Sequence, residues 1–132
     1  MLPFLTADPE GFPRAALLTP GEVRANSSTL LSVAVLAGSR TAINLIRRRQ
    51  ATLLYMQRGI AASIRLRAGR GRASRHDLDR TIFPLSVFRV RLDVPADAEG
   101  AVALLSGPTF TGRDAASLFS EELFEELGSA PA

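Results

Sequence analysis

The sequence of 132 residues contains no cysteine and no lysine. Without cysteine there are no disulfides, no thiolate metal sites and no cysteine nucleophile. Because all 16 basic residues are arginines, any anion site has to use guanidinium groups, hydroxyls and backbone N–H groups. The net charge of +3 is too small to indicate nucleic-acid binding by itself.

Long apolar runs are also missing. No stretch approaches the roughly 20 apolar residues that cross a bilayer, and residues 1–14 lack the basic start and long apolar core of a signal peptide. We therefore expect a cytoplasmic protein with no membrane partner. Domains commonly hold about 100–150 residues, so we expect one domain over 1–132, with 128–132 as a frayed tail.

Histidine occurs once, as His76, in a loop rich in arginine and aspartate. A general base is possible in principle, but a lone histidine in such a loop is more often a surface residue. No set of histidines and carboxylates has the spacing of metal ligands, and no nucleophile–base pair stands out. We predict no metal site, and the sequence identifies no catalytic residue.

Most of the chain has the pattern of β-strands joined by tight turns. The tetrapeptide Asp8-Pro9-Glu10-Gly11 suits a type I turn between the first two strands. In residues 85–94, we expect Phe88 to lie on one face with Val90, and Val87 on the other with Arg89. Apolar and alternating runs predict strands over 2–6, 14–19, 29–36, 51–56, 60–68 and 85–94.

A helical spacing follows Gly38 and predicts a helix from Ala42 to Arg49, with Ser39 or Thr41 as its N-cap. Weaker signals predict one helical turn over 74–79 and a helix over 96–105. A last helix is predicted over 114–127, ended by Gly128. Its apolar side would carry Phe119, Leu123 and Leu127, and its exposed side Glu121, Glu122, Glu125 and Glu126.

Two segments carry a family resemblance. Residues 14–19 read Arg-Ala-Ala-Leu-Leu-Thr on a predicted strand, and residues 38–41 read Gly-Ser-Arg-Thr before the first helix. Together they resemble the FMN-binding split-barrel family related to pyridoxamine 5′-phosphate oxidase. There the first segment has the pattern Arg-x-x-x-x-Lys and the second reads Ser-Arg-Lys. The resemblance covers about residues 2–68, and the strand over 85–94 fits a later barrel strand.

This resemblance implies a mainly β fold, a six- or seven-stranded antiparallel split β-barrel with short peripheral helices, in agreement with consecutive strands that close on themselves. It also implies a homodimer with FMN as cofactor. Tyr55 would lie in a barrel wall or at the dimer interface. The true oxidases are longer and carry an arginine-and-histidine substrate motif near the C-terminus, which is absent here, so that activity is not expected.

The resemblance also implies cofactor-binding residues. A helix start offers free N–H groups and the positive end of the helix dipole to a phosphate, and an arginine offers a bidentate fork. Ser63 falls near a position where the family often has a glutamine that contacts the flavin. The remaining residues divide into a phosphate group, Arg14, Ser39, Arg40 and Thr41, and a ring-lining group, Leu17, Leu18 and Thr19.

Three positions depart from the family pattern. Thr19 and Thr41 stand where the family has lysine, and Ser63 stands in place of the glutamine. Each lost charged hydrogen bond is worth about 1.5–3 kcal/mol. The leading hypothesis is an FMN-binding flavoprotein acting as a small-molecule oxidoreductase. The alternative is a cofactor-free dimeric ligand-binding or interaction protein of the same fold, and haem binding on this barrel is a third possibility.

Two groups of arginines remain. Arg47, Arg48 and Arg49 suit a solvated helix end. The second group consists of Arg65, Arg67, Arg70, Arg72 and Arg75. It has no interleaved aromatic residue of the kind that stacks on bases, so we do not expect a nucleic-acid partner. Some of its members could instead reach the flavin phosphate or a polyanionic substrate.

Overall fold

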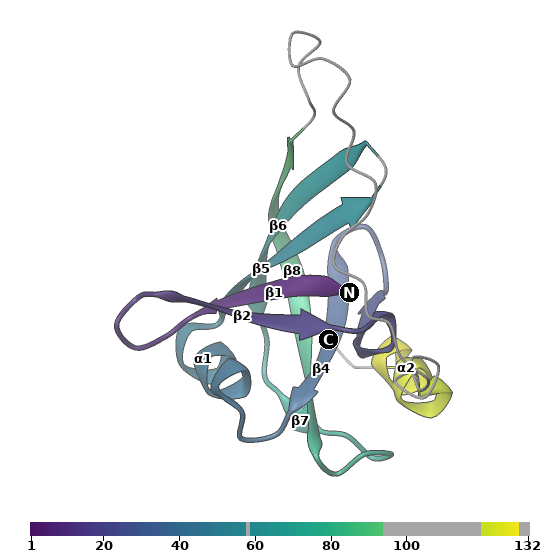
Figure 1. Ribbon diagram of the computed structural model, residues 1–132. Helices are drawn as coiled ribbons and strands as arrows, with labels where there is room; N and C mark the ends of the chain where they lie inside the picture. The colour runs from purple at the N-terminus through teal and green to yellow at the C-terminus, as the bar shows by residue number, and fades with distance from the viewer. Residues whose placement is uncertain (58, 94–119, 130–132) are drawn as a thin grey trace, which may run out of the picture.

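An antiparallel sheet forms the body of the molecule in the computed structural model, which describes residues 1–57, 59–93 and 120–129 (Figure 1). Its strands are β1 (Leu2–Ala7), β2 (Pro13–Leu18), β3 (Val23–Ala25), β4 (Leu30–Leu36), β5 (Gln50–Gln57), β6 (Ile60–Ala68), β7 (Arg72–Ala73) and β8 (Arg80–Asp93). The helices are a 3-10 turn η1 (Pro20–Glu22), α1 (Arg40–Arg48) and α2 (Glu121–Gly128).

The strand order is β2-β1-β5-β6-β8-β4-β3, with β7 paired to β8. All pairs are antiparallel. Among the described residues β2 and β3 do not pair with each other, so the sheet is an open half-barrel. The expected mainly β, antiparallel split barrel with short peripheral helices is therefore confirmed, with seven strands along its main path.

Alternation along the strands gives the sheet an inner and an outer face. We call the face that carries Phe4, Leu53 and Leu66 the inner face, and these three side chains are at most 2% exposed. Phe4 lies opposite Leu53, which lies opposite Ile64, so one apolar row crosses three strands. The outer face carries a second row, in which Leu5, Thr52 and Arg65 are successive partners. The main core thus fills the inner face.

Helix α1 closes one end of this core with Ala42 and Leu45. Ser39 is its N-cap and accepts the N–H of Ala42 at 3.2 Å. Ser39 is one of the two residues that were predicted as the N-cap. Asn44 is buried and donates to the Thr6 hydroxyl of β1 at 3.0 Å. Arg48, near the end of α1, also donates to the carbonyls of Asp8 at 3.2 Å and Pro9 at 2.9 Å. These polar contacts hold α1 against the β1–β2 hairpin.

Helix α2 lies at the opposite end of the sheet, near β3 and β4 (Figure 1). Leu123 and Leu127 pack on Ala34 and Ile82 and form a second, smaller core. The prediction that Glu126 lies on the exposed side of this helix was wrong, because the residue is only 7% exposed.

The Glu126 carboxylate is buried because three donors from the β7 region meet it. Arg72 Nη1 donates at 2.7 Å, the Ser74 hydroxyl at 2.7 Å, and the Arg75 N–H at 2.8 Å. Burial acts to raise the pKa of Glu126, but these hydrogen bonds and the nearby Arg72 charge outweigh it and lower the pKa to about 2. The periodicity of α2 does not reveal this, because the partners lie about fifty residues earlier.

Several local predictions differ from the structure. β3 and β7 have three and two residues, too few to give an alternating pattern. Residues 74–79 form bends and turns instead of a helical turn. β8 begins at Arg80, five residues before the predicted start, and includes Pro84 opposite Ser32. The predicted helix over 96–105 and the first part of the last helix, residues 114–119, lie outside the described residues.

A β-bulge changes the predicted facing of β8. Arg65 lies opposite Arg89, but the next residue of β6, Leu66, lies opposite Val87, so Phe88 is an extra residue in the ladder. Val87 therefore shares the inner face with Val90 and packs against the core. The prediction that grouped Val87 with Arg89 was wrong, because a bulge interrupts the period of two.

Candidate functional site

Two of the predicted phosphate-binding arginines meet at one cavity. Arg14 on β2 and Arg40 at the start of α1 both line a cavity of about 620 Å³, together with Asn44. Both arginines are exposed. In the part of the chain that the structure describes, neither makes an ion pair. Their positive charges are thus available to a ligand.

The β1–β2 hairpin explains how residues 26 positions apart come together. Asp8 closes its turn by accepting the N–H groups of Glu10 at 2.9 Å and Phe12 at 2.8 Å. Gly11 has a φ of +91°, which favours glycine. The turn sets the register in which Arg14 lies opposite Thr6, and Thr6 is the residue that binds Asn44 of α1.

The cavity also contains negative charge, because Asp8 and Glu10 lie on its wall. One oxygen of the Asp8 carboxylate is already engaged by the two turn N–H groups. Glu10 is exposed on the turn. An anion in this cavity would therefore be attracted by two guanidinium groups and repelled by two carboxylates, of which Asp8 is also engaged in the turn.

The start of α1 adds donors of its own. Ser39 accepts the N–H of Ala42 and so is engaged as a cap. The N–H groups of Arg40 and Thr41 have no acceptor within the described ranges, as expected for the first turn of a helix. Thr41 itself is 5% exposed. Its side chain is largely covered, in contrast to the side chain of Arg40.

The predicted ring-lining residues point in different directions. Leu18 is 4% exposed and belongs to the main core, whereas Leu17 is 46% exposed. Leu17 lies opposite Pro3 and on the face away from Arg14, since adjacent strand residues alternate. Leu18 shares the face of Arg14, and the outer backbone edge of β2 has no described strand as a partner.

Thr19 follows this edge and is 8% exposed. Its N–H donates to Glu22 Oε2 at 2.9 Å, and Glu22 is also paired with Arg80 at 2.8 Å. Its side-chain hydroxyl oxygen is buried and has no hydrogen-bond partner among the residues described. A buried polar atom without a partner is uncommon, so Thr19 is a candidate contact for a ligand group at the end of β2.

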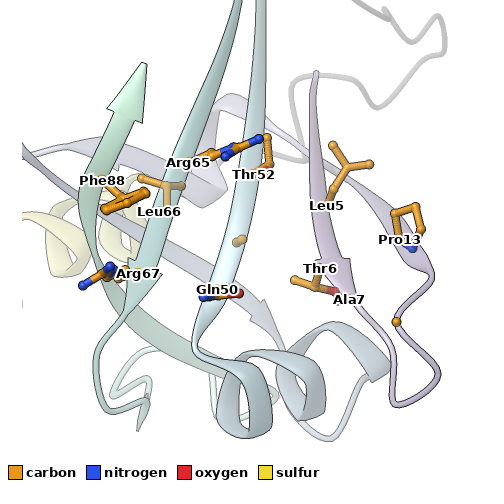
Figure 2. A pocket seen from close by; sticks show the side chains of 12 residues that line it. Leu5, Thr6, Ala7, Pro13, Gln50, Thr52, Arg65, Leu66, Arg67 and Phe88 are labelled. Atoms are coloured by element: carbon orange, nitrogen blue, oxygen red, sulfur yellow. The ribbon is translucent and has the colours of Figure 1, made fainter. Parts of the chain in front are cut away.

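Ser63 lies on the outer face of β6, opposite Leu54 and Arg91. It does not line the cavity of Arg14 and Arg40. A different cavity of about 420 Å³, which was not predicted from the sequence, lies on this outer face. Figure 2 shows some of its lining residues on β1, β5, β6 and β8: Leu5, Thr52, Arg65, Arg67 and Phe88.

The five-arginine group does not form one patch. Arg65 and Arg67 lie on the outer face, while Arg72 is paired with Glu126 at 2.7 Å. His76 is exposed beside Arg72 and Arg75 at a third cavity, of about 450 Å³. Among the described residues no group of three histidines, cysteines or carboxylates could hold a metal ion, and no helix is long and apolar enough to span a membrane.

The open antiparallel sheet with small helices at its ends is the fold of a split-barrel protein. No family model and no curated protein matches the sequence. Solved structures with a similar fold include an F420 reductase, with a TM-score of 0.58 and 9% identity, covering 68% of this chain and 87% of its own.

Two further solved structures share the fold. An FMN-binding protein from Syntrophomonas wolfei subsp. wolfei has a TM-score of 0.59 and 7% identity, covering 72% of this chain and 78% of its own. A variant of HupZ from Group A Streptococcus has a TM-score of 0.57 and 12% identity, covering 69% of this chain and 87% of its own. At these identities the similarity establishes the fold alone.

Proposed function

We propose that this protein binds FMN or a closely related flavin-type cofactor, with the phosphate between Arg14 and Arg40. The observation that carries the proposal is the shared cavity of these two arginines, which make no ion pair with a described residue. Guanidinium forks bind phosphate bidentately, and the free N–H groups at the start of α1 add donors and a favourable dipole. The similar folds of an FMN-binding protein and an F420 reductase support the same class of ligand.

The ring would lie along the open edge of β2. Leu17 follows Arg14 by three residues, or about 10 Å of strand. The backbone edge at Leu17 and Leu18 has no strand partner among the described residues, and the buried Thr19 hydroxyl has no described hydrogen-bond partner. Ser63 remains a proposed flavin contact on the evidence of the resemblance alone. A bound flavin supplies hydride or electron transfer while the protein positions it, so we propose a small-molecule oxidoreductase.

We further propose a homodimer. Four apolar side chains lie exposed on the inner face where β5, β6 and β8 extend beyond the core, and apolar clusters of this kind favour association. They are Tyr55, Ile60, Val90 and Leu92, which are 37%, 44%, 52% and 61% exposed. Sedimentation velocity of the wild type and of Leu92→Glu tests this. A wild type that stays monomeric at high concentration would refute it.

The alternative of a cofactor-free dimeric ligand-binding or interaction protein also has a specific observation in its favour. Both positions that carry lysine in the resembling family hold buried threonines here. Two of the positive charges of a flavin-phosphate site are therefore missing, and Glu10 adds a negative one nearby. Under this alternative the protein neither quenches flavin fluorescence nor copurifies with a yellow chromophore.

The test is a titration with FMN followed by quenching of flavin fluorescence. Each charged hydrogen bond is worth about 1.5–3 kcal/mol, so Arg14→Ala and Arg40→Ala should each weaken FMN binding by about tenfold to a hundredfold. Arg47→Ala removes the same charge from the exposed end of the same helix and should leave binding unchanged. No saturable binding at millimolar FMN, or equal effects of all three substitutions, would reject the proposal.

A further inference from the structure

The outer face of β6 and β8 carries a concentration of positive charge that the proposed flavin site does not use. Arg65 and Arg67 on β6 lie beside Arg89 and Arg91 on β8, and Arg65 is the direct cross-strand partner of Arg89. All four are exposed, and none of them makes an ion pair with a described residue. Asp93 is the one carboxylate in these two strands, at the end of β8.

Like charges directly opposite each other in a sheet reduce stability. The Arg65–Arg89 pair therefore has no explanation in the stability of the fold. Two guanidinium groups side by side do fit a phosphate, which accepts hydrogen bonds from both at once. The arrangement indicates an anion that neutralises the pair.

The β-bulge places an aromatic ring among these charges. Phe88 is the extra residue of β8 and is 53% exposed on the outer face. The Arg67 guanidinium carbon lies 4.4 Å from the centroid of its ring, and that of Arg89 lies 5.8 Å from it. These cation–π contacts place the ring among the arginine side chains. Phe88 belongs to a different strand from Arg65 and Arg67, so no aromatic residue is interleaved with these arginines in the sequence.

A cavity of about 420 Å³ adjoins Arg65, Arg67 and Phe88, within the range of roughly 300–1,000 Å³ typical of small-molecule sites. Leu5 and Pro13 give it an apolar wall, while Thr52 and Gln50 add a hydroxyl and an amide (Figure 2). The site thus combines a cationic end, a flat apolar surface and a few hydrogen-bonding groups. That combination suits a phosphate ester that carries a planar ring.

We infer that this outer-face site binds a nucleotide, with its phosphates at Arg65 and Arg89 and its base against Phe88. A single aromatic ring and a patch of about 13 Å from residue 63 to residue 67 suit one nucleotide better than a nucleic-acid strand. The site lies on the face of the sheet opposite the Arg14 side chain, so the inference stands independently of the proposed flavin site.

The test is isothermal titration calorimetry with ATP. The double variant Arg65→Ala/Arg89→Ala should lose about tenfold or more in ATP affinity, because two charged hydrogen-bonding groups are removed. Its fold should persist, since the pair it removes is repulsive. The control Arg47→Ala/Arg70→Ala removes the same charge from exposed positions outside all three cavities and should change ATP affinity by less than about threefold.

A second variant separates the base from the phosphates. Phe88→Leu should weaken ATP binding but leave binding of inorganic tripolyphosphate unchanged, since tripolyphosphate has no ring to stack. Equal losses in the two double variants would show unspecific charge attraction and overturn the inference. Loss of ATP binding in Arg14→Ala/Arg40→Ala, or a far tighter complex with a single-stranded oligonucleotide, would also overturn it.

Discussion

The two ends of the sheet use the same kinds of residue in different ways. At the α2 end, Glu126 is surrounded by Arg72, Ser74 and the backbone of residue 75, and Arg80 is paired with Glu22. At the α1 end, Arg14 and Arg40 face a cavity without an ion pair to any residue that the structure describes. The α2 end thus pairs its arginines with carboxylates, whereas the two arginines at the α1 end have no described ion-pair partner.

The difference separates stability from binding. A buried carboxylate whose partners are complete holds two segments together, and removal of one partner leaves the others unsatisfied. Arginines beside a cavity contribute little to the folded state, because exposed charges are well solvated. We therefore expect substitutions at the α2 end to change the free energy of unfolding and substitutions at the α1 end to change ligand affinity.

The largest effect should come from Glu126→Ala. The substitution leaves Arg72, the Ser74 hydroxyl and the Arg75 N–H without their acceptor, so we expect a loss of about 2–4 kcal/mol in the free energy of unfolding. Urea denaturation followed by circular dichroism measures it. Glu125→Ala, on the exposed side of the same helix, is the matched control. A Glu126 variant as stable as this control would show that the two ends do not differ.

A smaller effect should appear as a pH dependence. The pKa of Glu126 is lowered from 4.5 to about 2 in the folded chain, so the unfolded chain binds more protons than the folded one below pH 4.5. The stabilisation by Glu126 is complete above that pH and is lost as the pH falls toward 2. We expect the stability difference between the wild type and Glu126→Gln to shrink over this range. A constant difference would contradict the assignment.

The smallest effect on stability should come from Arg14→Ala and Arg40→Ala. Neither side chain has a described ion-pair partner, so both variants should unfold within about 0.5 kcal/mol of the wild type. The same urea experiment tests this. A loss above about 1 kcal/mol in either variant would mean that the arginine supports the fold, and the reduced FMN affinity expected for it would then have a second explanation.

The local part of the fold was predictable from the sequence. The Ser39 cap, the turn at Asp8 and the alternation in β6 follow from neighbouring residues. The resemblance placed Arg14 and Arg40 at one phosphate site, and the structure brings both to one cavity. The helix and the hairpin that line this cavity are joined by the Asn44–Thr6 contact and by Arg48, which donates to the carbonyls of Asp8 and Pro9. No local sequence pattern contains these contacts.

The features that prediction missed depend on distant partners. Glu126 has the spacing of an exposed helix residue, but its donors come from the β7 region. The outer-face cavity combines residues of β1, β5, β6 and β8, and periodicity says nothing about which strands become neighbours. The bulge at Phe88 has no sequence marker such as glycine, so the strand appeared regular.

The bulge at Phe88 shifts the inward–outward alternation of the β8 side chains by one residue. Before it the odd-numbered residues Phe83 and Leu85 fill the core, and after it the even-numbered Val90 and Leu92 continue on the same side. Because the bulge absorbs the additional residue, arginines 89 and 91 stay on the outer face. Deletion of Phe88 alone would preserve this sorting and remove only the ring, so this position can gain or lose a binding group without a change in the surrounding architecture.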